Sequence, residues 1–432
     1  MSKKTYNVIE YQELDKNYFD GEKLFNLFRN FVEEYDPNDD SDVLNFVKFS
    51  YKRGQGEIIK FNNYVGLIQF ANGKQIQILP KIANVNDSSE TNYSNTKKIL
   101  FNMLKCLKWK DHKIVNFANT DIRKMNILEI FICMYINETE YLLKSGIKSK
   151  YIDKNENLNI FKGKLLVKEN ILYNHSHKER FYVSFDEFSQ DCSENRIIKA
   201  TLNKLLKISY DINNQFRLKK LLQQLDHIKA SVNFEYDFNH IMINRDTKSY
   251  DNIIEWSKVF LLNKSFWTSS GRNVSKSLLF PMNRIFEDYI THHIKKKFGA
   301  EGWDVRTQVR KENLFDNPPI FKLIPDILII KNGKGVIIDT KWKKLINNKK
   351  KNYGVSQDDM YQMYTYCKKY KVKGNDINHV YVLYPLSEDF KEPEPEFISN
   401  DNVNLHIFFI DLNDINYSME QLYKNIKSKV LK

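Results

Sequence analysis

Three charged residues in the last third of the chain, Asp326, Asp339 and Lys341, have types and spacing that could carry out chemistry. Two β-branched runs flank the dipeptide Asn332-Gly333, which favours a tight two-residue turn. A turn at this dipeptide places Asp326 directly opposite Asp339 on the neighbouring strand, with Cβ atoms about 4.5–5.5 Å apart. Because side chains alternate along a strand, Lys341 is expected on the same face as Asp339. The pattern therefore predicts three charged groups converging on one face of a hairpin.

Two facing carboxylates repel each other unless something offsets their charge, and a divalent cation is the natural offset. Their hard oxygen atoms suit Mg²⁺, or Mn²⁺ in its place. A metal held by two carboxylates can polarise a phosphodiester and lower the pKa of a bound water. Lys341 could then orient that water or stabilise the charge that develops on the phosphorane. We therefore expect Asp326 and Asp339 to be metal ligands, and all three residues to form a catalytic centre.

The surroundings of the acidic pair predict strands buried on both faces, since residues 327–330 and 336–338 are continuous apolar runs. Carboxylates without partners would be costly there. Thr340 and Trp342 are expected to point away from Asp339. Two alternatives stay open: an exposed hairpin whose charges are solvated or ion-paired, and a longer turn or bulge that would break the register.

Two predicted helices could add to this centre. On the helix expected over residues 278–298, Glu287 lies at the margin of the apolar stripe and could be a further metal ligand or a surface acid. On the helix expected over residues 358–370, Gln362 and Tyr366 share a face, which suits contacts to the reacting centre or to a DNA backbone, or packing alone. Three tyrosines of that helix could stack on bases or belong to the core: Tyr361, Tyr364 and Tyr370.

The elements that would position these residues predict a mixed α and β (α/β) fold with a C-terminal domain over residues 274–432. Apolar periodicity predicts its strands and helices in an order that gives a mixed sheet. After the helix at 278–298 come strands at 305–309, 321–330 and 335–342, the helix at 358–370, and strands at 379–384 and 405–410.

The preceding sequence predicts two further regions. Residues 1–150 are expected to contain a sheet at 57–82 with a hairpin turn at Asn72-Gly73, a loop at 87–96, and helices at 97–109 and 126–144. Residues 151–273 are expected to begin with short strands between 160 and 188 and to continue as helices at 195–208, 215–228 and 253–266.

The composition of the 432-residue chain restricts its class. A chain of this length favours two or three domains. The formal net charge of +13 suits a protein that approaches a polyanion, and equally a lysine-rich composition with no such role. No stretch is apolar enough to cross a membrane and the N-terminus is unlike a signal peptide, so we expect a cytoplasmic protein with reduced cysteines. No Walker-type phosphate-binding motif is present, which argues against nucleotide hydrolysis in this chain.

The motifs in combination resemble the McrC family, the nuclease subunits of McrBC-type restriction systems. The resemblance is spread over most of the chain and rests on the order of short motifs. They are Tyr64-Val-Gly66, Ile78-Leu-Pro-Lys81, Phe161-Lys-Gly163-Lys, Phe185-Asp-Glu-Phe188, Asn195-Arg196, Leu279-Phe-Pro-Met-Asn283, Phe286-Glu287, Asp326, Asp339-Thr-Lys341 and Asp359-Met-Tyr-Gln362-Met-Tyr-Thr-Tyr366.

The resemblance implies a C-terminal PD-(D/E)xK nuclease that cuts double-stranded DNA, preceded by a region that docks onto a ring of McrB, an AAA+ GTPase. GTP would be bound by that partner, whose hydrolysis this subunit would stimulate in phage defence. Residues 57–82 and the nearby helices would face the partner. Two alternatives stay open: a self-sufficient nuclease in DNA repair or phage defence, and a GTPase-activating scaffold with a vestigial site. The sequence does not indicate whether the target is methylated, the cleavage pattern or the stoichiometry.

Overall fold

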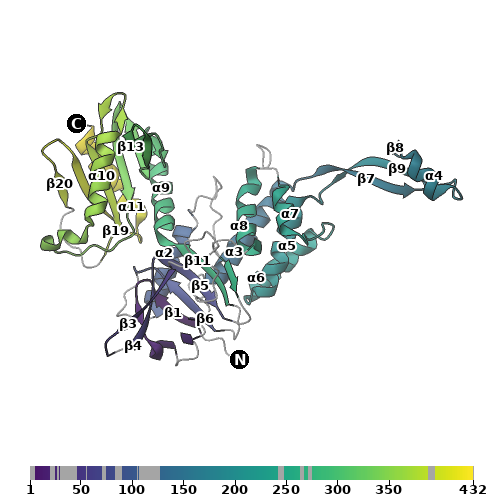
Figure 1. Ribbon diagram of the computed structural model, residues 1–432, viewed down its shortest axis with the longest axis horizontal. Coiled ribbons are helices and arrows are strands. Elements are labelled where there is room, and N and C mark those ends of the chain that lie inside the picture. Colours follow the sequence, from purple (N-terminus) through teal and green to yellow (C-terminus); the bar gives the residue numbers. More distant parts are fainter. Residues whose placement is uncertain are drawn as a thin grey trace.

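The computed structural model describes residues 5–19, 25–26, 29, 46–54, 56–70, 74–82, 90–104, 106, 127–241, 248–262, 267–270, 275–387 and 395–431. Figure 1 shows an N-terminal β-region, a helical body from which a long arm projects, and a C-terminal α/β region. The mixed α and β class predicted from the sequence is therefore confirmed. None of the helices in these ranges is long and apolar enough to cross a membrane.

The N-terminal region is built on two small sheets. The larger has the order β1 (Thr5–Ile9), β6 (Gln75–Leu79), β5 (Tyr64–Gln69), β11 (Ser275–Pro281) and β10 (Trp267–Ser270). The smaller has the order β2 (Glu13–Leu14), β4 (Gly56–Phe61) and β3 (Val47–Lys52). The sheet predicted over residues 57–82 is thus present, and the turn predicted at Asn72-Gly73 lies outside the described residues.

Strand β11 corrects the start of the long helix predicted over residues 278–298. Residues 276–281 pair with β5, and the helix α9 begins only at Met282 and ends at Ala300. Pro281 stands immediately before the helix, where the lack of an N–H is tolerated, whereas a proline one turn inside would break it. Leu279 and Phe280 are buried in different core clusters, so the segment uses both of its faces as a strand. Residues assigned to the third region therefore share a sheet with the first.

The helical body contains the helices predicted in the middle of the chain, with shifted ends. They are α2 (Glu90–Leu104), α3 (Ile127–Ser145), α5 (Ser193–Ile208), α6 (Ile212–Gln224) and α8 (Asp251–Leu262). The short helix α7 (Phe234–Asn239) was not predicted. The loop predicted over residues 87–96 is wrong from residue 90 onward, because α2 begins there despite its Asn and Ser residues. Tertiary packing overrides their weak helix propensity.

A two-stranded arm leaves this body between α3 and α5. It consists of β7 (Lys150–Leu158), β9 (Phe181–Ser189), the short strand β8 (Lys164–Leu165) and the helix α4 (Val167–Asn174). Nine residues of β7 pair with nine of β9, and at about 3.3 Å per residue such a ribbon is about 30 Å long. Figure 1 shows the arm extending away from the rest of the molecule, with α4 at its tip.

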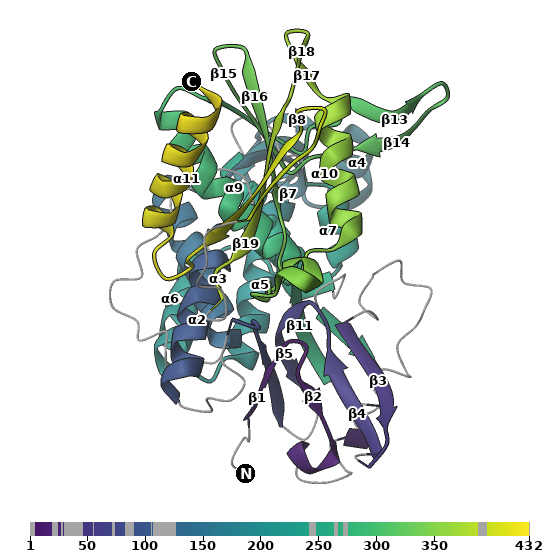
Figure 2. The same ribbon diagram turned by 90° about the vertical axis from the view of Figure 1, so that its left-hand side faces the viewer.

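The C-terminal region is a mixed six-stranded sheet between helices. Its order is β12 (Asp304–Thr307), β15 (Ile327–Lys331), β16 (Lys334–Thr340), β19 (His379–Pro385), β21 (Asn404–Ile410) and β20 (Glu396–Ile398). The helices α9 and α11 (Ile415–Val430) cover one face, and α10 (Gln357–Lys369) covers the other (Figure 2). The mixed sheet is confirmed, whereas α11 was not predicted.

The strand predicted over residues 321–330 is two strands. Strand β14 (Pro319–Leu323) pairs with β13 (Glu312–Asp316) in a separate hairpin, and β15 starts only at Ile327. Pro325 lies in the break, where it has no N–H to offer a sheet. The break leaves Asp326 just outside the regular strand. A third hairpin joins β17 (Lys371–Val372) and β18 (Asn375–Asp376).

One buried polar contact joins the N-terminal sheet to the C-terminal sheet. Glu10 follows β1, and its Oε1 accepts hydrogen bonds from the indole Nε1 of Trp342 at 2.6 Å and from the backbone N–H of Lys81 at 2.9 Å. The ammonium of Lys81 donates to the carbonyl of Trp342 at 2.6 Å and lies over its ring. Burial raises the pKa of Glu10 to about 7, against the opposing effect of Lys81. Trp342 lies two residues after the end of β16, so the contact holds the chain at the end of this strand.

Replacing Trp342 by Phe should measure the strength of this contact. Phe keeps an aromatic ring but removes the N–H that Glu10 accepts, and a lost hydrogen bond to a buried carboxylate costs on the order of 1–3 kcal/mol. We expect the free energy of unfolding in urea to fall by that amount.

Trp303→Phe is the matched control for this experiment. Trp303 is also buried, but its indole nitrogen makes no hydrogen bond within the described ranges. Both changes remove similar volume, so the control should cost clearly less. Equal losses in the two variants would show that the contact with Glu10 adds no stability.

Candidate active site

The hairpin of β15 and β16 has the register predicted from its turn. Asn332 and Gly333 both have positive φ, 52° and 76°, as a type I′ turn requires. Ile327 pairs with Ile338, and each following pair keeps the same register to the turn. Continued by one residue, this register sets Asp326 opposite Asp339. The predicted register is therefore confirmed for the paired residues, and the alternative of a longer turn or bulge is wrong.

Asp339 lies on the face of the sheet that α10 covers. Its neighbour in the alternation, Ile337, belongs to the core cluster formed with α10, while Val336 and Ile338 belong to the cluster formed with α9. Asp339 is only 2% exposed. Burial and the like charge of Asp326 raise the pKa of Asp339 to about 7. The two acids are thus close enough to perturb each other's ionisation.

Asp326 is held by the end of β16. Its Oδ2 accepts hydrogen bonds from the backbone N–H and from the hydroxyl of Thr340, each at 2.8 Å. This corrects the expectation that Thr340 points away from the acidic pair. Asp326 precedes β15 and Thr340 ends β16, so strict alternation of side chains no longer holds at this edge. Trp342 does point away, onto Phe286 of α9, with ring centroids 5.2 Å apart.

Lys341 lies on the same side as Asp339, as predicted. Its Nζ is 2.9 Å from Oδ2 of Asp339 and 3.9 Å from Oδ1 of Asp359. It also donates to Oε1 of Gln362 at 3.1 Å. Burial lowers the pKa of Lys341, but the carboxylates of Asp339 and Asp359 raise it by more. The pKa therefore lies above its ordinary value, and the amine stays charged. The ammonium is therefore fixed beside the acidic pair.

Helix α10 supplies the far side of the site. Gln362 donates from Nε2 to the hydroxyl of Tyr366 at 2.8 Å, and Tyr366 in turn donates to the carbonyl of Ile324 at 3.0 Å. Tyr366 is buried, and burial together with Asp339 and Asp326 raises its pKa. Tyr366 thus supports the side chain of Gln362 from the buried side of the helix. Of the two alternatives for this pair, Gln362 contacts the centre through Lys341, and Tyr366 packs behind it.

Asp359 is a residue of the site that the sequence analysis did not single out. It lies in the first turn of α10, where it pairs with Lys343 at 2.6 Å and approaches Lys341. A signal was available, because Asp359 and Gln362 are three residues apart on one helix and so share a face. Its charge also contributes to the raised pKa of Asp339.

Glu287 is not brought into the acidic group as a third ligand. Its Oε1 accepts a hydrogen bond from the side chain of Gln308, whose backbone N–H donates to the carbonyl of Asp326 at 2.9 Å. In the described part of the chain, no group of three His, Cys, Asp or Glu side chains is placed to hold a metal. Two carboxylates still fit Mg²⁺, which commonly takes one or two and completes its shell with waters and phosphate oxygens.

The mixed sheet, its covering helices and the charged edge together define an α/β protein with a group of acids and a lysine at one edge of its C-terminal sheet. The family model for McrBC 5-methylcytosine restriction system components matches residues 59–385. The chain belongs to this family. The match includes the hairpin, α10 and the arm, and so most of the resemblance drawn from the motifs.

Solved structures match the chain, and the first named here has a similar fold. One is a refined half-complex from the tetradecameric assembly of Thermococcus gammatolerans McrB AAA+ hexamers with bound McrC, with 19% identity and a TM-score of 0.67. That match covers 98% of this chain and 100% of the other. Another is the cryo-EM structure of the Thermococcus gammatolerans McrBC complex, with 20% identity, a TM-score of 0.47, and 68% and 88% of the two chains covered. No curated protein sequence matches the chain.

Replacing Asp339 by Asn should change how the stability of the metal-free protein depends on pH. The pKa of an aspartate in an unfolded chain is about 3.9, whereas the pKa of Asp339 in the folded protein is about 7. The wild type therefore loses stability as the pH rises between these values, and the loss is complete above the higher one. Asn does not ionise, so the variant should gain stability relative to wild type between about pH 5 and about pH 8.

Urea unfolding in EDTA at several pH values measures this difference. Asp358→Asn, which removes an exposed carboxylate one residue before Asp359 on α10, is the matched control. A stability difference for Asp339→Asn that stays constant across the pH range would contradict the burial and charge repulsion assigned to this carboxyl group.

Proposed function

We propose that this chain is the Mg²⁺-dependent endodeoxyribonuclease subunit of a GTP-dependent McrBC-type restriction system. It would cut double-stranded DNA when bound to an McrB-like AAA+ GTPase hexamer and would stimulate that GTPase. The observation that carries the proposal is the buried carboxylate of Asp339 beside Asp326, with Lys341 fixed 2.9 Å from Asp339. Family membership and the shared fold support the same assignment.

The residues have separable tasks in this proposal. Asp326 and Asp339 would hold Mg²⁺, or Mn²⁺ in its place, and the ion would supply Lewis acidity at a phosphate oxygen and an acidified water. Lys341 stays protonated beside Asp339 and can orient the attacking water or stabilise negative charge on the phosphorane. Asp359 and Gln362 restrain the ammonium, and Thr340 orients Asp326.

The arm is the part of the chain best suited to dock onto a partner. Large apolar side chains are exposed at its tip, including Ile171 and Leu172, each 66% exposed, and Ile160, Val167 and Tyr173. Soluble proteins rarely leave such a group uncovered unless another molecule covers it. The McrC chain with the similar fold is described as bound to McrB hexamers. We therefore assign the apolar tip of the arm to contact with the AAA+ partner.

Residues 57–82, expected to face the partner, are less suited to this role. None of their described side chains is fully exposed. The strands lie between two core clusters, one containing Leu67 and Leu79 and the other containing Ile68 and Ile78. Alternating apolar residues on both faces place this segment inside the N-terminal region.

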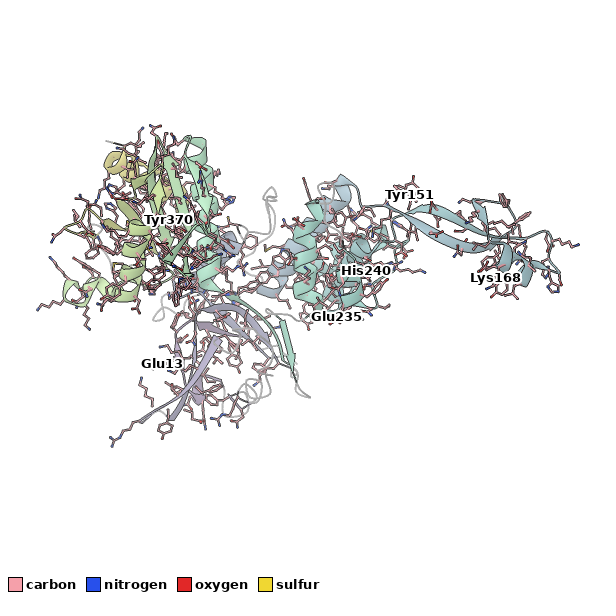
Figure 3. The ribbon with its side chains drawn as sticks, turned by 45° about the horizontal axis from the view of Figure 1, so that its top comes forward. Glu13, Tyr151, Lys168, Glu235, His240 and Tyr370 are labelled. Atoms are coloured by element: carbon pink, nitrogen blue, oxygen red, sulfur yellow. The ribbon has the colours of Figure 1, made fainter. Side chains whose placement is uncertain are left out.

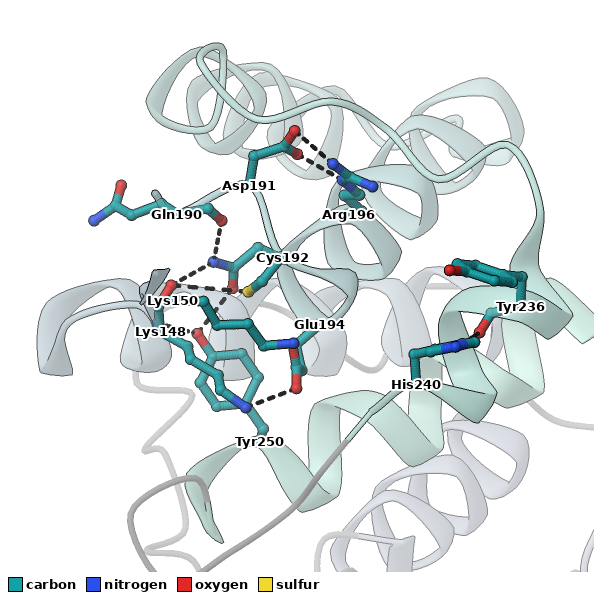
Figure 4. Close-up of polar contacts among 11 residues, drawn as sticks. Lys148, Lys150, Gln190, Asp191, Cys192, Glu194, Arg196, Tyr236, His240 and Tyr250 are labelled. Atoms are coloured by element: carbon teal, nitrogen blue, oxygen red, sulfur yellow. Dashed lines mark hydrogen bonds and ion pairs between the residues drawn. The ribbon is translucent and has the colours of Figure 1, made fainter. Parts of the chain in front are cut away.

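The base of the arm is anchored to the helical body by hydrogen bonds at the ends of both of its long strands. Glu194, fully buried, accepts a hydrogen bond from Nζ of Lys148 at 2.7 Å, just before β7 (Figure 4). Asn195 donates to the carbonyls of Lys148 at 2.9 Å and Gln190 at 2.8 Å, and so ties both strands to α5. Figure 3 shows Tyr151 near this base and Lys168 at the tip. Motion of the tip would therefore reach the helical body.

The tip itself has a specific structure. Asn174 exchanges two hydrogen bonds with Asn157, at 2.8 and 2.9 Å, and donates to Asn170. Gly163 has φ of 72°, and a Cβ at this position would lie 2.3 Å from the carbonyl of Ser184. These contacts present α4 at the end of the arm in one orientation.

DNA cleavage by the purified chain should require Mg²⁺, the AAA+ partner and GTP together. Asp339→Ala should abolish cutting because it removes a metal ligand, and should leave stimulation of GTP hydrolysis unchanged because the docking arm is intact. Asp358→Ala is the control and should cut as wild type. Efficient cutting by the chain alone would overturn partner dependence, and cutting by Asp339→Ala would overturn the assigned metal site.

Replacing both Ile171 and Leu172 by Asp should weaken docking onto the AAA+ partner and leave the acidic pair unchanged. Charged side chains in a buried interface are costly, so we expect at least a tenfold weaker association with the AAA+ partner, about 1.4 kcal/mol or more, and loss of GTPase stimulation. Co-elution on a sizing column and phosphate release measure these effects. Val232→Asp changes a side chain that is 97% exposed in the helical body and is the control. Unchanged association of the arm variant would rule out docking through the tip.

A further inference from the structure

A cavity of about 680 Å³ lies between α10 and the edge strand β20, on the α10 side of the C-terminal sheet. Its apolar walls include Tyr361 and Tyr364 from α10 and Phe397 and Ile398 from β20. All four are exposed to solvent, with Tyr361 62% exposed. Tyr370, which directly follows α10, is instead buried in the core. The two explanations for these tyrosines were base stacking and core packing. Core packing fits Tyr370, whereas Tyr361 and Tyr364 line an open cavity.

Polar groups also line the cavity. Asn352, Gln357 and Ser399 contribute side chains that can donate or accept hydrogen bonds. Gln357 donates to the hydroxyl of Tyr361, and Tyr364 donates to Asp401. Aromatic faces with a few polar groups at the rim are suited to a flat heteroaromatic ligand that carries hydrogen-bonding edges.

The charge around the cavity is positive. Residues 343–351, which lead from the catalytic strand to the cavity, contain five lysines and no acid. Lys349, Lys350 and Lys351 are exposed and directly precede Asn352 in the lining. The one acid hydrogen-bonded to a lining tyrosine, Asp401, is paired with Lys368 at 2.6 Å, and Lys368 also lies over the ring of Tyr364. This environment favours a ligand attached to phosphates.

The cavity and the catalytic centre share helix α10. Gln362 contacts Lys341, and the adjacent Tyr361 faces the cavity, about 100° further round the helix at 3.6 residues per turn. Asp359, two residues before Tyr361, pairs with Lys343 of the basic segment. A DNA strand cut at the acidic pair would therefore pass within reach of the cavity.

We propose that this cavity binds an unpaired base of the DNA strand next to the cutting site. Tyr361 and Tyr364 stack on the base, and the lysines of residues 343–351 contact its backbone. The inference rests on the proposed nuclease function and names its substrate more closely: DNA in which at least one base is displaced from its pair. A base inside an intact duplex cannot enter such a cavity.

A polypeptide added as a strand to the free edge of β20 is the competing occupant. The lysines and the stacking geometry favour the nucleic acid, since base stacking on aromatic side chains tolerates any base and needs only a neighbouring phosphate site. A protein ligand would instead need acidic or apolar side chains and would be insensitive to base pairing.

The test compares binding of two DNA duplexes by the full chain in EDTA, where no cutting occurs. One duplex carries 2-aminopurine as an unpaired bulged base, and the other carries it fully paired. Tyr361→Ala with Tyr364→Ala should weaken binding of the bulged duplex roughly tenfold and abolish quenching of its fluorescence, while paired DNA changes by less than about twofold. Tyr361→Phe with Tyr364→Phe keeps both rings and should bind as wild type.

Tyr417→Ala is the matched control, because Tyr417 is also 62% exposed but lies on α11. Equal weakening for both duplexes, or none for the bulged one, would overturn the proposal. So would loss of AAA+ partner binding with base quenching intact, which would make the cavity a protein site. The outcome is independent of cutting: Asp339→Asn should still quench the base. Quenching without cleavage in the complete system would reject only the nuclease assignment.

Discussion

The electrostatic cost of burying Asp339 beside Asp326 is the constraint on which the surrounding structure depends. Two like charges in a poorly solvated place drive one of them to keep its proton, and the raised pKa of Asp339 reflects this. The groups in contact with the pair reduce that cost: Thr340 donates twice to Asp326, and Lys341 pairs with Asp339. A cation of the proposed kind would reduce it further. Keeping the two acids together therefore lowers the stability of the folded protein.

Strand β16 serves two purposes because its side chains alternate. Asp339 and Lys341 face α10 and the proposed chemistry, whereas Ile338 and Trp342 face α9 and the N-terminal region. A shift of Glu10 or Lys81 would reach Lys341 through a single intervening residue. The helical body, the N-terminal sheet and the α9 side of the C-terminal sheet are in turn continuous in one packed core. The arm joins this body through the hydrogen bonds at its base. The proposed docking tip and the proposed cutting centre are thus connected through the helical body.

The parts of the site that obey local rules could be predicted from the sequence. The Asn332-Gly333 turn fixes the register of the hairpin, and strand alternation places Lys341 with Asp339. Contacts between distant segments could not be predicted, because no local pattern encodes them. Glu10 and Trp342 are 332 residues apart in sequence. The tip of the arm was missed for a similar reason, since its apolar residues are typical of a core and only the fold shows that they are exposed.

The position of β11 has a consequence for how such proteins can be divided or recombined. This strand directly precedes the C-terminal region along the chain, yet it lies in the interior of the N-terminal sheet, between β5 and β10, and runs without a linker into α9. A fragment that begins there would carry an unpaired strand, and the remaining fragment would have a gap in its sheet. The C-terminal α/β region is therefore not a portable module. Exchange of this region between proteins would have to include the N-terminal sheet as well.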